Sequence, residues 1–434
     1  MHKWLQLGFA NLVLLTVVSA QPLTLEVAIR MALENNPDAM LARSRLMELE
    51  SHETLASSVN YPRISVRGNY HQTTNPMQGF GAILSEGTFD NSLDFNDPGQ
   101  IDQFTGAVEA RYRIYSGGER NAAIESARQM RAAGSHDLES AEINLEAAVV
   151  ETYFGIRQSD EILRSIDSGI QHLEENLRIS RVRESSGELI RSERLNLEVE
   201  LAARRQDRLS QQHESEMMRI RMAYLLGLPA GESIELADED ASLEKIAYPN
   251  SPGIESRPEL LAAEAMAQAA SERVRVARSG RMPKMDAYAS WQADKGWRRE
   301  GSETSWTAGL SLRMDIFDGG ATRSRIGAAK AQERAAMEHV RKTRLHLQME
   351  LEQALRIHEL AKGQKAVAVK QVEQSREVAR LSRNQFAAGK LLSTELIGVE
   401  SRLVEAEVQL ALATSRERLS LARLRQVSGH RILF

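Results

Sequence analysis

Two stretches of this chain change periodicity in the same way, and this repeated change limits the possible folds more than any other feature. In Phe104–Gly118, FTGAVEARYRIYSGG, apolar residues alternate with mostly polar ones up to Ile114, which is the two-residue period of a β-strand with unlike faces. A Gly-Gly pair ends this strand, and a proline-free helical pattern of about seventy residues follows, far longer than an ordinary globular helix. Trp306–Gly320, WTAGLSLRMDIFDGG, repeats the same order. The chain is therefore predicted to be an internal duplication.

The spacing of glycines supports the duplication. Gly117 and Gly319 follow the two strands and are 202 residues apart, and Gly187 and Gly389, where the long helical patterns end, are also 202 residues apart. The distance from the first strand to the Gly-Gly pair is instead 19 residues longer in the first repeat. An insertion in the loop between two strands indicates that this loop lies at an exposed tip. The equal distances within the helical stretches indicate that the two long helices have the same length and form a rigid span.

The duplication divides the chain into a first repeat, residues 21–255, and a second repeat, residues 256–434. In the first repeat we expect two helices, the first capped by Thr24 and the second from Asn36-Pro37 to about Val59. They are followed by strands at about 62–71 and 104–114, a long helix at about 118–185, a return helix at about 189–226 and an irregular equatorial segment at 228–255. In the second we expect a helix at about 257–280, strands at about 284–293 and 306–316, a long helix at about 320–387 and a return helix at about 391–426. Residues 72–103, rich in Gly, Asn, Asp and Ser, are predicted to be a long loop.

The long helical patterns carry apolar stripes that require partner helices. In the first long helix, spacings of three and four residues define a stripe at Leu145, Val149, Tyr153, Ile156, Ile162, Ile166, Ile170, Leu173 and Leu177. The return helix of the second repeat keeps a 3-4-3-4 spacing, the seam of a left-handed coiled coil, at Leu396, Val399, Leu403, Ala406 and Leu410. We therefore expect the helices to pair along their length.

Residues 1–20 are predicted to be a secretory signal peptide, because His2 and Lys3 precede an apolar core that ends in small residues at Ala20. A retained membrane anchor is the alternative. The chain contains no cysteine, which excludes disulfides, thiolate metal sites and an acylated N-terminal cysteine, so we do not expect a lipoprotein. The net charge is only −5, so no basic field indicates nucleic acid as a partner.

Four strands of about eleven residues match the tilted length that crosses a bilayer. Four strands leave two open edges, which hydrocarbon does not tolerate, so the chain is expected to oligomerise. Two copies would give eight strands with a filled interior, and three would give twelve strands with room for a channel. A soluble sandwich is the alternative. The side chains expected to face inward and line water are Arg67, Glu109, Arg111, Arg113, Arg313 and Asp315.

These features together resemble the TolC-type outer-membrane efflux protein family, the outer membrane factors. The resemblance is carried by the opening LTLEVAIRMALENNP, the proline-led strands YPRISVRGNY and MPKMDAYASW, the two Gly-Gly junctions and the two-fold repeat. It implies a mainly α chain with transmembrane β-structure, in which four strands per chain contribute to a trimeric 12-stranded barrel continued by a long α-helical periplasmic tunnel.

The same resemblance implies a location and partners. The protein would be a homotrimer in the cell outer membrane, in contact with lipid and with a large periplasmic portion. It would work with a periplasmic adaptor, the membrane fusion protein, and with a proton-driven or ATP-driven inner-membrane transporter. Efflux of drugs, metals or other small molecules and type I protein secretion both stay open.

The resemblance also assigns the turns between the long and return helices as the adaptor-contact tip of the tunnel. The matching residues are Gly187, Ser192 and Glu193 in the first repeat and Gly389, Thr394 and Glu395 in the second. Glycine permits the positive φ of a helix end, the hydroxyl is expected to cap the next helix, and the acid favours that helix's N-terminus. Two capped turns without a partner would explain the same residue types.

Some members of the family carry two acidic rings at the tunnel mouth. Glu395 matches the first ring, but Gly398 occupies the position of the second, so a trimer would have one ring of three carboxylates. Arg191, Arg194 and Arg402 provide the alternative, a latch in which these arginines pair with the acids. The sequence does not decide between a gate ring and a latch.

The Gly-Gly junctions, Gly117 with Gly118 and Gly319 with Gly320, are expected to form the hinge between barrel and tunnel. No motif indicates an enzyme, a metal site or a cofactor: His358-Glu359 lacks the second histidine of a zinc helix, and there is no phosphate-binding loop. The sequence therefore predicts a passive export duct. A structural periplasmic coiled-coil protein is the alternative from a different class.

Overall fold

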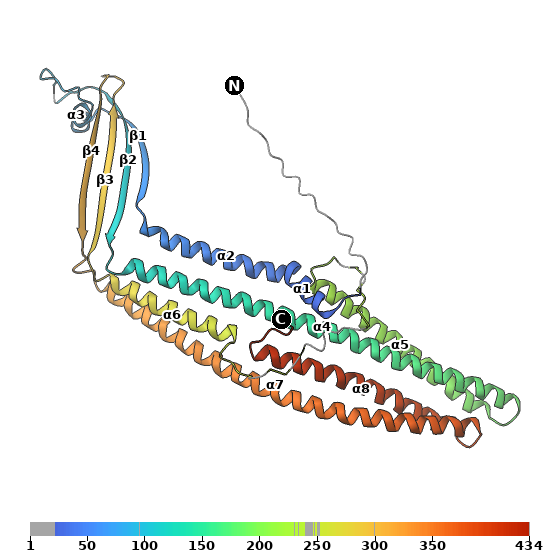
Figure 1. Ribbon diagram of the computed structural model, residues 1–434. Helices are drawn as coiled ribbons and strands as arrows, with labels where there is room; N and C mark the ends of the chain where they lie inside the picture. The colour runs from blue at the N-terminus through green and yellow to red at the C-terminus, as the bar shows by residue number, and fades with distance from the viewer. Residues whose placement is uncertain are drawn as a thin grey trace. The chain divides into compact units, whose positions relative to one another are not determined.

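The computed structural model describes residues 22–433 except 95, 230, 233, 239–245, 247, 250, 251 and 299, and Figure 1 shows its helices and strands. The predicted signal peptide lies outside the described residues. Within the described ranges, no helix combines the length and the apolar character that crossing a membrane requires. Contacts divide the chain into two compact units: the first comprises the chain up to Leu41, Ala141–Ile254 and Leu347–Phe434, and the second comprises Ala42–Ser140 and Glu255–His346. Each unit takes segments from both repeats.

The second unit contains one antiparallel sheet whose four strands follow chain order. They are β1 (Arg63–Thr73), β2 (Ile101–Tyr115), β3 (Lys284–Lys295) and β4 (Ser302–Arg313). β2 begins three residues earlier than expected, and β4 ends before residues 314–316, so Asp315 lies beyond the strand. β1 and β4 are the two edges of the sheet within this chain.

The register sorts the side chains onto two unlike faces. Val66, Val108, Trp291 and Trp306 lie opposite one another across the four strands, and Val66 is 80% and Trp306 77% exposed. The alternate row carries polar side chains, because Asn69 faces Thr105, then Asp294 and then Glu303. We call these the apolar face and the polar face of the sheet.

The charged residues expected to face inward lie in the rows of the polar face, except Asp315. Arg67 pairs with Glu109 at 3.4 Å across β1 and β2, and Arg113 pairs with Asp286 at 2.9 Å across β2 and β3. Both pairs bridge neighbouring strands, so they add side-chain contacts to the backbone ladder.

The residues expected to form a long loop before β2 contain a helix, α3 (Pro76–Ser85). The loop prediction was wrong for these ten residues. Asn75 is the N-cap, and its side chain accepts a hydrogen bond from the backbone N–H of Met77 at 3.0 Å. Ala82 and Ile83 are buried against Ile101 of β2, so packing on the sheet stabilises this short helix.

The other helices of the second unit are α2 (Pro37–Ser57) from Ala42 onward, a 3₁₀ turn (Ser58–Asn60), α6 (Pro258–Ser279) and the first parts of α4 (Glu119–Ser185) and α7 (Ala321–Ala387). Glu53 of α2 pairs with Arg131 of α4 at 2.7 Å, and Ser126 of α4 donates to the carbonyl of Ala269 in α6 at 3.2 Å. These contacts place the helices side by side.

The first unit contains α1 (Leu25–Asn35), α5 (Arg191–Leu225), α8 (Ser393–Val427) and the remaining parts of α4 and α7. All nine stripe residues of α4 are at most 9% exposed, which confirms that stripe. One apolar cluster surrounds Tyr153, and a second surrounds Leu197, Phe386 and Leu396. The four long helical segments therefore form two hairpins, α4 with α5 and α7 with α8, that bury the apolar stripe of α4. Other large apolar side chains of α5 and α7 stay exposed, among them Val199, Leu209, Leu360 and Val367.

Candidate functional site

The turns that end the two hairpins have the same backbone conformation. Gly187 between α4 and α5 has φ +79°, and Gly389 between α7 and α8 has φ +75°. In both turns the N–H of the residue after the glycine donates to the carbonyl five positions earlier, at 2.8 Å. This bond and the positive φ define the Schellman motif, which explains why glycine occupies both positions.

The surroundings of the two glycines differ. A Cβ at Gly187 would meet nothing within 4 Å, whereas a Cβ at Gly389 would lie 3.0 Å from Nη2 of Arg183. Arg183, at the end of α4, donates from Nη1 to the carbonyl of Phe386 at 2.9 Å and lies 5.6 Å from the centre of its ring. Arg183 therefore ties the first hairpin to the second beside Gly389. Sequence reasoning missed this residue, because nothing distinguishes it from the other arginines of α4.

The start of α8 is held by a residue of the other repeat. The side chain of Glu193, in the first turn of α5, accepts hydrogen bonds from the backbone N–H of Ser393, at 2.7 Å, and from its hydroxyl. This carboxylate lies at the N-terminus of α8, where a negative charge is favourable. The expected acid at a helix N-terminus is thus present, but it serves the neighbouring helix.

The hydroxyl residues do not cap their helices. The N-cap residues are Ile190 for α5 and Leu392 for α8, and neither provides a side-chain cap. Ser192 and Thr394 lie two positions further on, inside the helices, so the capping prediction was wrong. The cap of α8 is supplied by Glu193 instead, a contact between residues 200 positions apart.

Two of the three arginines proposed for a latch, Arg194 and Arg402, have other partners. Arg194 binds Glu184 and Glu198, each at 2.5 Å, and Arg402 donates to the carbonyl of Gly398 at 2.9 Å. Among the described residues, no ion pair joins Arg191, Arg194 or Arg402 to Glu395, which is exposed. Arg194 thus closes its own hairpin by joining the end of α4 to the start of α5.

Ion pairs between long and return helices recur at equivalent positions of the repeats. Arg181 of α4 lies 3.5 Å from Glu198 of α5, and 202 residues later Arg383 of α7 lies 2.6 Å from Glu400 of α8. In another pair the charges are exchanged: Glu174 with Arg205 in the first hairpin corresponds to Arg376 with Glu407 in the second. The second half thus keeps the interaction with the opposite polarity.

Replacing Glu400 by glutamine should destabilise the protein by about 3 kcal/mol, because it leaves the guanidinium of Arg383 without its buried counter-ion. Glu400 is 3% exposed, and both of its oxygens accept hydrogen bonds from Arg383. The matched control is Glu174→Gln, whose pair with Arg205 has side chains 47% and 60% exposed and should change stability by less than about 1 kcal/mol. Urea unfolding of the purified variants in detergent, followed by circular dichroism, measures both values. Equal effects of the two substitutions would contradict the prediction.

The strand-to-helix junctions share a turn with two consecutive positive φ values: +64° and +86° at Gly117 and Gly118, and +66° and +87° at Gly319 and Gly320. The residue before each pair caps the long helix. Ser116 accepts from the N–H of Arg120 at 3.2 Å, and Asp318 accepts from the N–H of Thr322 at 2.7 Å. The hydroxyl and N–H of Thr322 lower the pKa of Asp318. Each junction is thus a defined turn rather than a loose connection.

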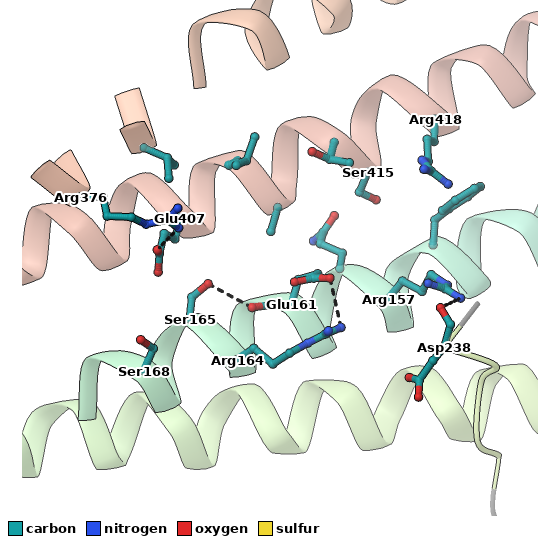
Figure 2. A pocket seen from close by; sticks show the side chains of 16 residues that line it. Arg157, Glu161, Arg164, Ser165, Ser168, Asp238, Arg376, Glu407, Ser415 and Arg418 are labelled. Carbon is teal, nitrogen blue, oxygen red and sulfur yellow. Dashed lines mark hydrogen bonds and ion pairs between the residues drawn. The ribbon is translucent and has the colours of Figure 1, made fainter. Parts of the chain in front are cut away.

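A groove of about 670 Å³ lies in the first unit between α4, α7 and α8. Figure 2 shows the arginines and acids that line it, and several of them are paired with each other. Arg164 binds Glu161 at 3.1 Å, and Arg376 binds Glu407 at 2.8 Å. Arg157 donates to the carbonyl of Asp238 at 3.2 Å. Two of the lining arginines are thus paired with carboxylates of the groove itself.

No catalytic arrangement emerges from these residues. In the part of the chain that the structure describes, no group of three His, Asp or Glu side chains is placed to hold a metal ion. His358 contacts the hydroxyl of Ser420 at 3.0 Å and the ring of Tyr248, so it belongs to the packing between α7 and α8.

Comparisons with known proteins match nearly the whole chain. A family model described as outer membrane efflux protein matches residues 28–227 and 253–430. The pyoverdine export outer membrane protein OpmQ of Pseudomonas putida is 23% identical over 421 residues, which cover 93% of this chain and 86% of OpmQ. The fusaric acid resistance protein FusA of Burkholderia cepacia is 25% identical over 321 residues, 71% of this chain and 58% of FusA.

Solved structures agree with the fold described above. The outer-membrane channel OprN has a TM-score of 0.79 at 20% identity, with 93% of this chain and 89% of OprN covered. VceC of Vibrio cholerae also has a TM-score of 0.79, at 16% identity, with 94% and 96% covered. The chain therefore has the fold of these channels, in which its four-stranded sheet fits one third of a trimeric barrel that continues into a helical tunnel.

Proposed function

The chain belongs to the outer membrane efflux protein family, and from this premise we propose that three copies form a passive duct of a tripartite efflux system. The duct crosses the outer membrane as a twelve-stranded barrel and continues through the periplasm as a helical tunnel. An inner-membrane pump supplies the energy, and a periplasmic adaptor opens the tunnel at the hairpin turns. We do not expect a lipid anchor, because this sequence contains no cysteine to carry one.

The observation that carries this proposal is a sheet that combines an exposed apolar face with two unpaired edge strands. One face presents exposed apolar side chains in register across all four strands, as a lipid-facing surface requires. The edges at β1 and β4 have no strand partner within the described chain. Since unpaired backbone groups cost several kcal/mol each in hydrocarbon, β4 of one copy must pair with β1 of the next.

The hairpin turns support adaptor contact. Both end in an exposed glycine turn of identical backbone, and they lie beside each other because Arg183 and Glu193 join them. A helical hairpin of the adaptor approaches closely where no Cβ projects, as at Gly187.

A carboxylate ring is the better-supported gate. Glu395 is exposed, and two of the three arginines that would latch it, Arg194 and Arg402, bind other partners in the chain. Three copies of Glu395 would place three negative charges at the tunnel mouth, where they disfavour anions and repel one another. Contact with the adaptor would relieve this crowding as the mouth widens.

Efflux of small molecules is favoured over protein secretion. The relatives are named for pyoverdine export and for resistance to fusaric acid. We propose a substrate of this general kind, delivered by whichever pump the adaptor joins.

Planar-bilayer recording tests the duct. Purified protein added to a bilayer should give discrete current steps, and the protein should stay in membranes washed with high salt or carbonate. Release by salt alone together with absence of current steps would reject the duct and favour the structural coiled-coil alternative. Heating in detergent should convert a trimer band to a monomer band on a gel.

A further inference from the structure

Helix α3 packs on the polar face of the sheet. Its buried residues Ala82 and Ile83, 3% and 0% exposed, contact Ile101, which is 3% exposed. Ile101 pairs with Thr73 and lies two residues before Gln103, so its side chain belongs to the polar face. Figure 1 shows α3 at the end of the strands away from α2 and α6.

Two more contacts confirm this side of the sheet. The hydroxyl of Thr73 in β1 donates to the side chain of Gln78 in α3 at 3.1 Å. After α3, Gly87 has φ +69°, and a Cβ there would lie 2.7 Å from Cγ of Glu303 in β4. Thr73 and Glu303 both belong to polar-face rows. The segment around α3 therefore spans the sheet from one edge strand to the other.

Polar side chains are buried at this end of the sheet. Gln103 is 7% and Asp294 3% exposed, whereas the side chain of Arg67, nearer the middle of β1, is 69% exposed. On the apolar face, Val66 and Trp306 stay exposed, whereas at this end of the sheet Trp297 of the β3–β4 loop lies against the rings of Tyr70 and Phe104. The segment around α3 thus covers the polar face at this end, and the β3–β4 loop covers part of the apolar face there.

We propose that α3 sets the size limit of the solutes that leave the duct; this inference rests on the proposed trimeric barrel. There the polar face lines the lumen, so three copies of α3 project into its outer mouth. Twelve strands about 4.8 Å apart, tilted by about 40°, enclose a circle about 24 Å wide between backbones. Three helices about 10 Å thick need a circle roughly 22 Å wide when they touch. The mouth is therefore the narrow part of the barrel.

α3 and the residues after it present apolar side chains to a passing solute. Met77 and Leu84 of α3 are 80% and 51% exposed, and Phe89, which follows the helix, is 44% exposed. Apolar or amphipathic solutes narrower than the remaining gap pass along these side chains, and large hydrophilic solutes are excluded.

The β3–β4 hairpin supplies a matched replacement loop. Its six residues, 296–301, connect Lys295 and Ser302, a pair on the apolar face, and Gln72 and Asp102 form the equivalent apolar-face pair in the first hairpin. Replacing residues 73–101 by the sequence of residues 296–301 removes α3 and Ile101 and keeps the strand pairing. In channels that also carry Glu395→Gln, which removes the proposed carboxylate ring at the tunnel mouth, single-channel conductance should rise at least about two-fold, because conductance follows the narrowest section of a pore. Cells that produce the variant should also become sensitive to large hydrophilic antibiotics.

Thiol labelling separates this role from a general effect of loop removal. The chain has no cysteine, so Met77→Cys introduces a single thiol. A bulky water-soluble thiol reagent added from the outer side should lower the conductance of Met77→Cys channels at least about two-fold and leave Val66→Cys, on the lipid-facing surface, unchanged. Normal channels whose conductance changes neither with loop replacement nor with labelling would overturn the size limit and leave the duct intact. If the unaltered protein formed no channels, both the size limit and the proposed duct would be overturned.

Discussion

Replacing Gly117 by valine should prevent the protein from accumulating as a membrane-inserted trimer. Gly117 has φ +64°, and a Cβ there would lie 2.3 Å from Cβ of Met282 and 3.3 Å from the carbonyl oxygen of Ser279. The left-handed backbone alone costs roughly 1–2 kcal/mol for a residue with a Cβ, and a β-branched side chain adds an overlap that only backbone movement relieves. Together these costs are a large fraction of the 5–15 kcal/mol that stabilises a typical domain.

Gly319→Val is the matched control for this prediction. Gly319 has φ +66°, but a Cβ there would meet nothing within 4 Å. In this variant only the left-handed backbone is unfavourable. We therefore expect a trimer that still inserts into the membrane but dissociates at a lower temperature than the wild type. Membrane fractionation and heating in detergent measure both properties. The double variant Gly117→Val with Gly118→Val should behave as Gly117→Val does. If the Gly117→Val trimer were as heat-stable as the wild type, the prediction that this turn must keep its conformation for assembly would be wrong.

Replacing Gly389 by arginine should abolish export while leaving the trimer assembled. The new side chain would start 3.0 Å from Nη2 of Arg183, bring two guanidinium groups together and push Arg183 away from the carbonyl of Phe386. It would also place a bulky cation where the adaptor is proposed to dock. We expect at least a tenfold loss of export, corresponding to about 1.4 kcal/mol or more of lost adaptor binding. Antibiotic susceptibility and dye efflux of cells measure this loss.

Two further variants separate docking from the loss of the Arg183 contact. Gly187→Arg adds the same cation at an open position, and there it disturbs no neighbouring side chain. Arg183→Ala removes the tie and leaves both glycines in place. If the turns bind the adaptor, Gly187→Arg loses export as well and Arg183→Ala retains most of it. Normal export by both glycine variants would reject the docking role of the turns.

Periodicity identified the long helices and the sheet because both depend on local pattern. The stripe from Leu145 to Leu177 is buried at every position, and none of the seam residues from Leu396 to Leu410 is exposed. The glycine pairs were recognisable because consecutive positive φ values strongly favour glycine. In each case a few neighbouring residues determine the conformation.

The contacts that were missed join residues far apart in the chain. Helix α3 contains Gly79 and Gly81, which lower helix propensity, and it is stabilised by Ile101 from the following strand. Glu193 and Ser393 are 200 positions apart, and local preferences suggested a cap from Ser192 or Thr394 instead. Tertiary packing decided both outcomes, and no short window of sequence contains that information.

The equal lengths of the corresponding helices restrict how such a chain changes during evolution. α4 and α7 contain 67 residues each, and α5 and α8 contain 35 each. One residue deleted from a single helix shifts its turn by about 1.5 Å and rotates the following stripe by about 100°. Arg183 and Glu193 would then lose their partners in the other hairpin. Lineages with shorter or longer tunnels are therefore expected to differ by paired deletions or insertions in both gene halves, in multiples of about seven residues, which restore the stripe.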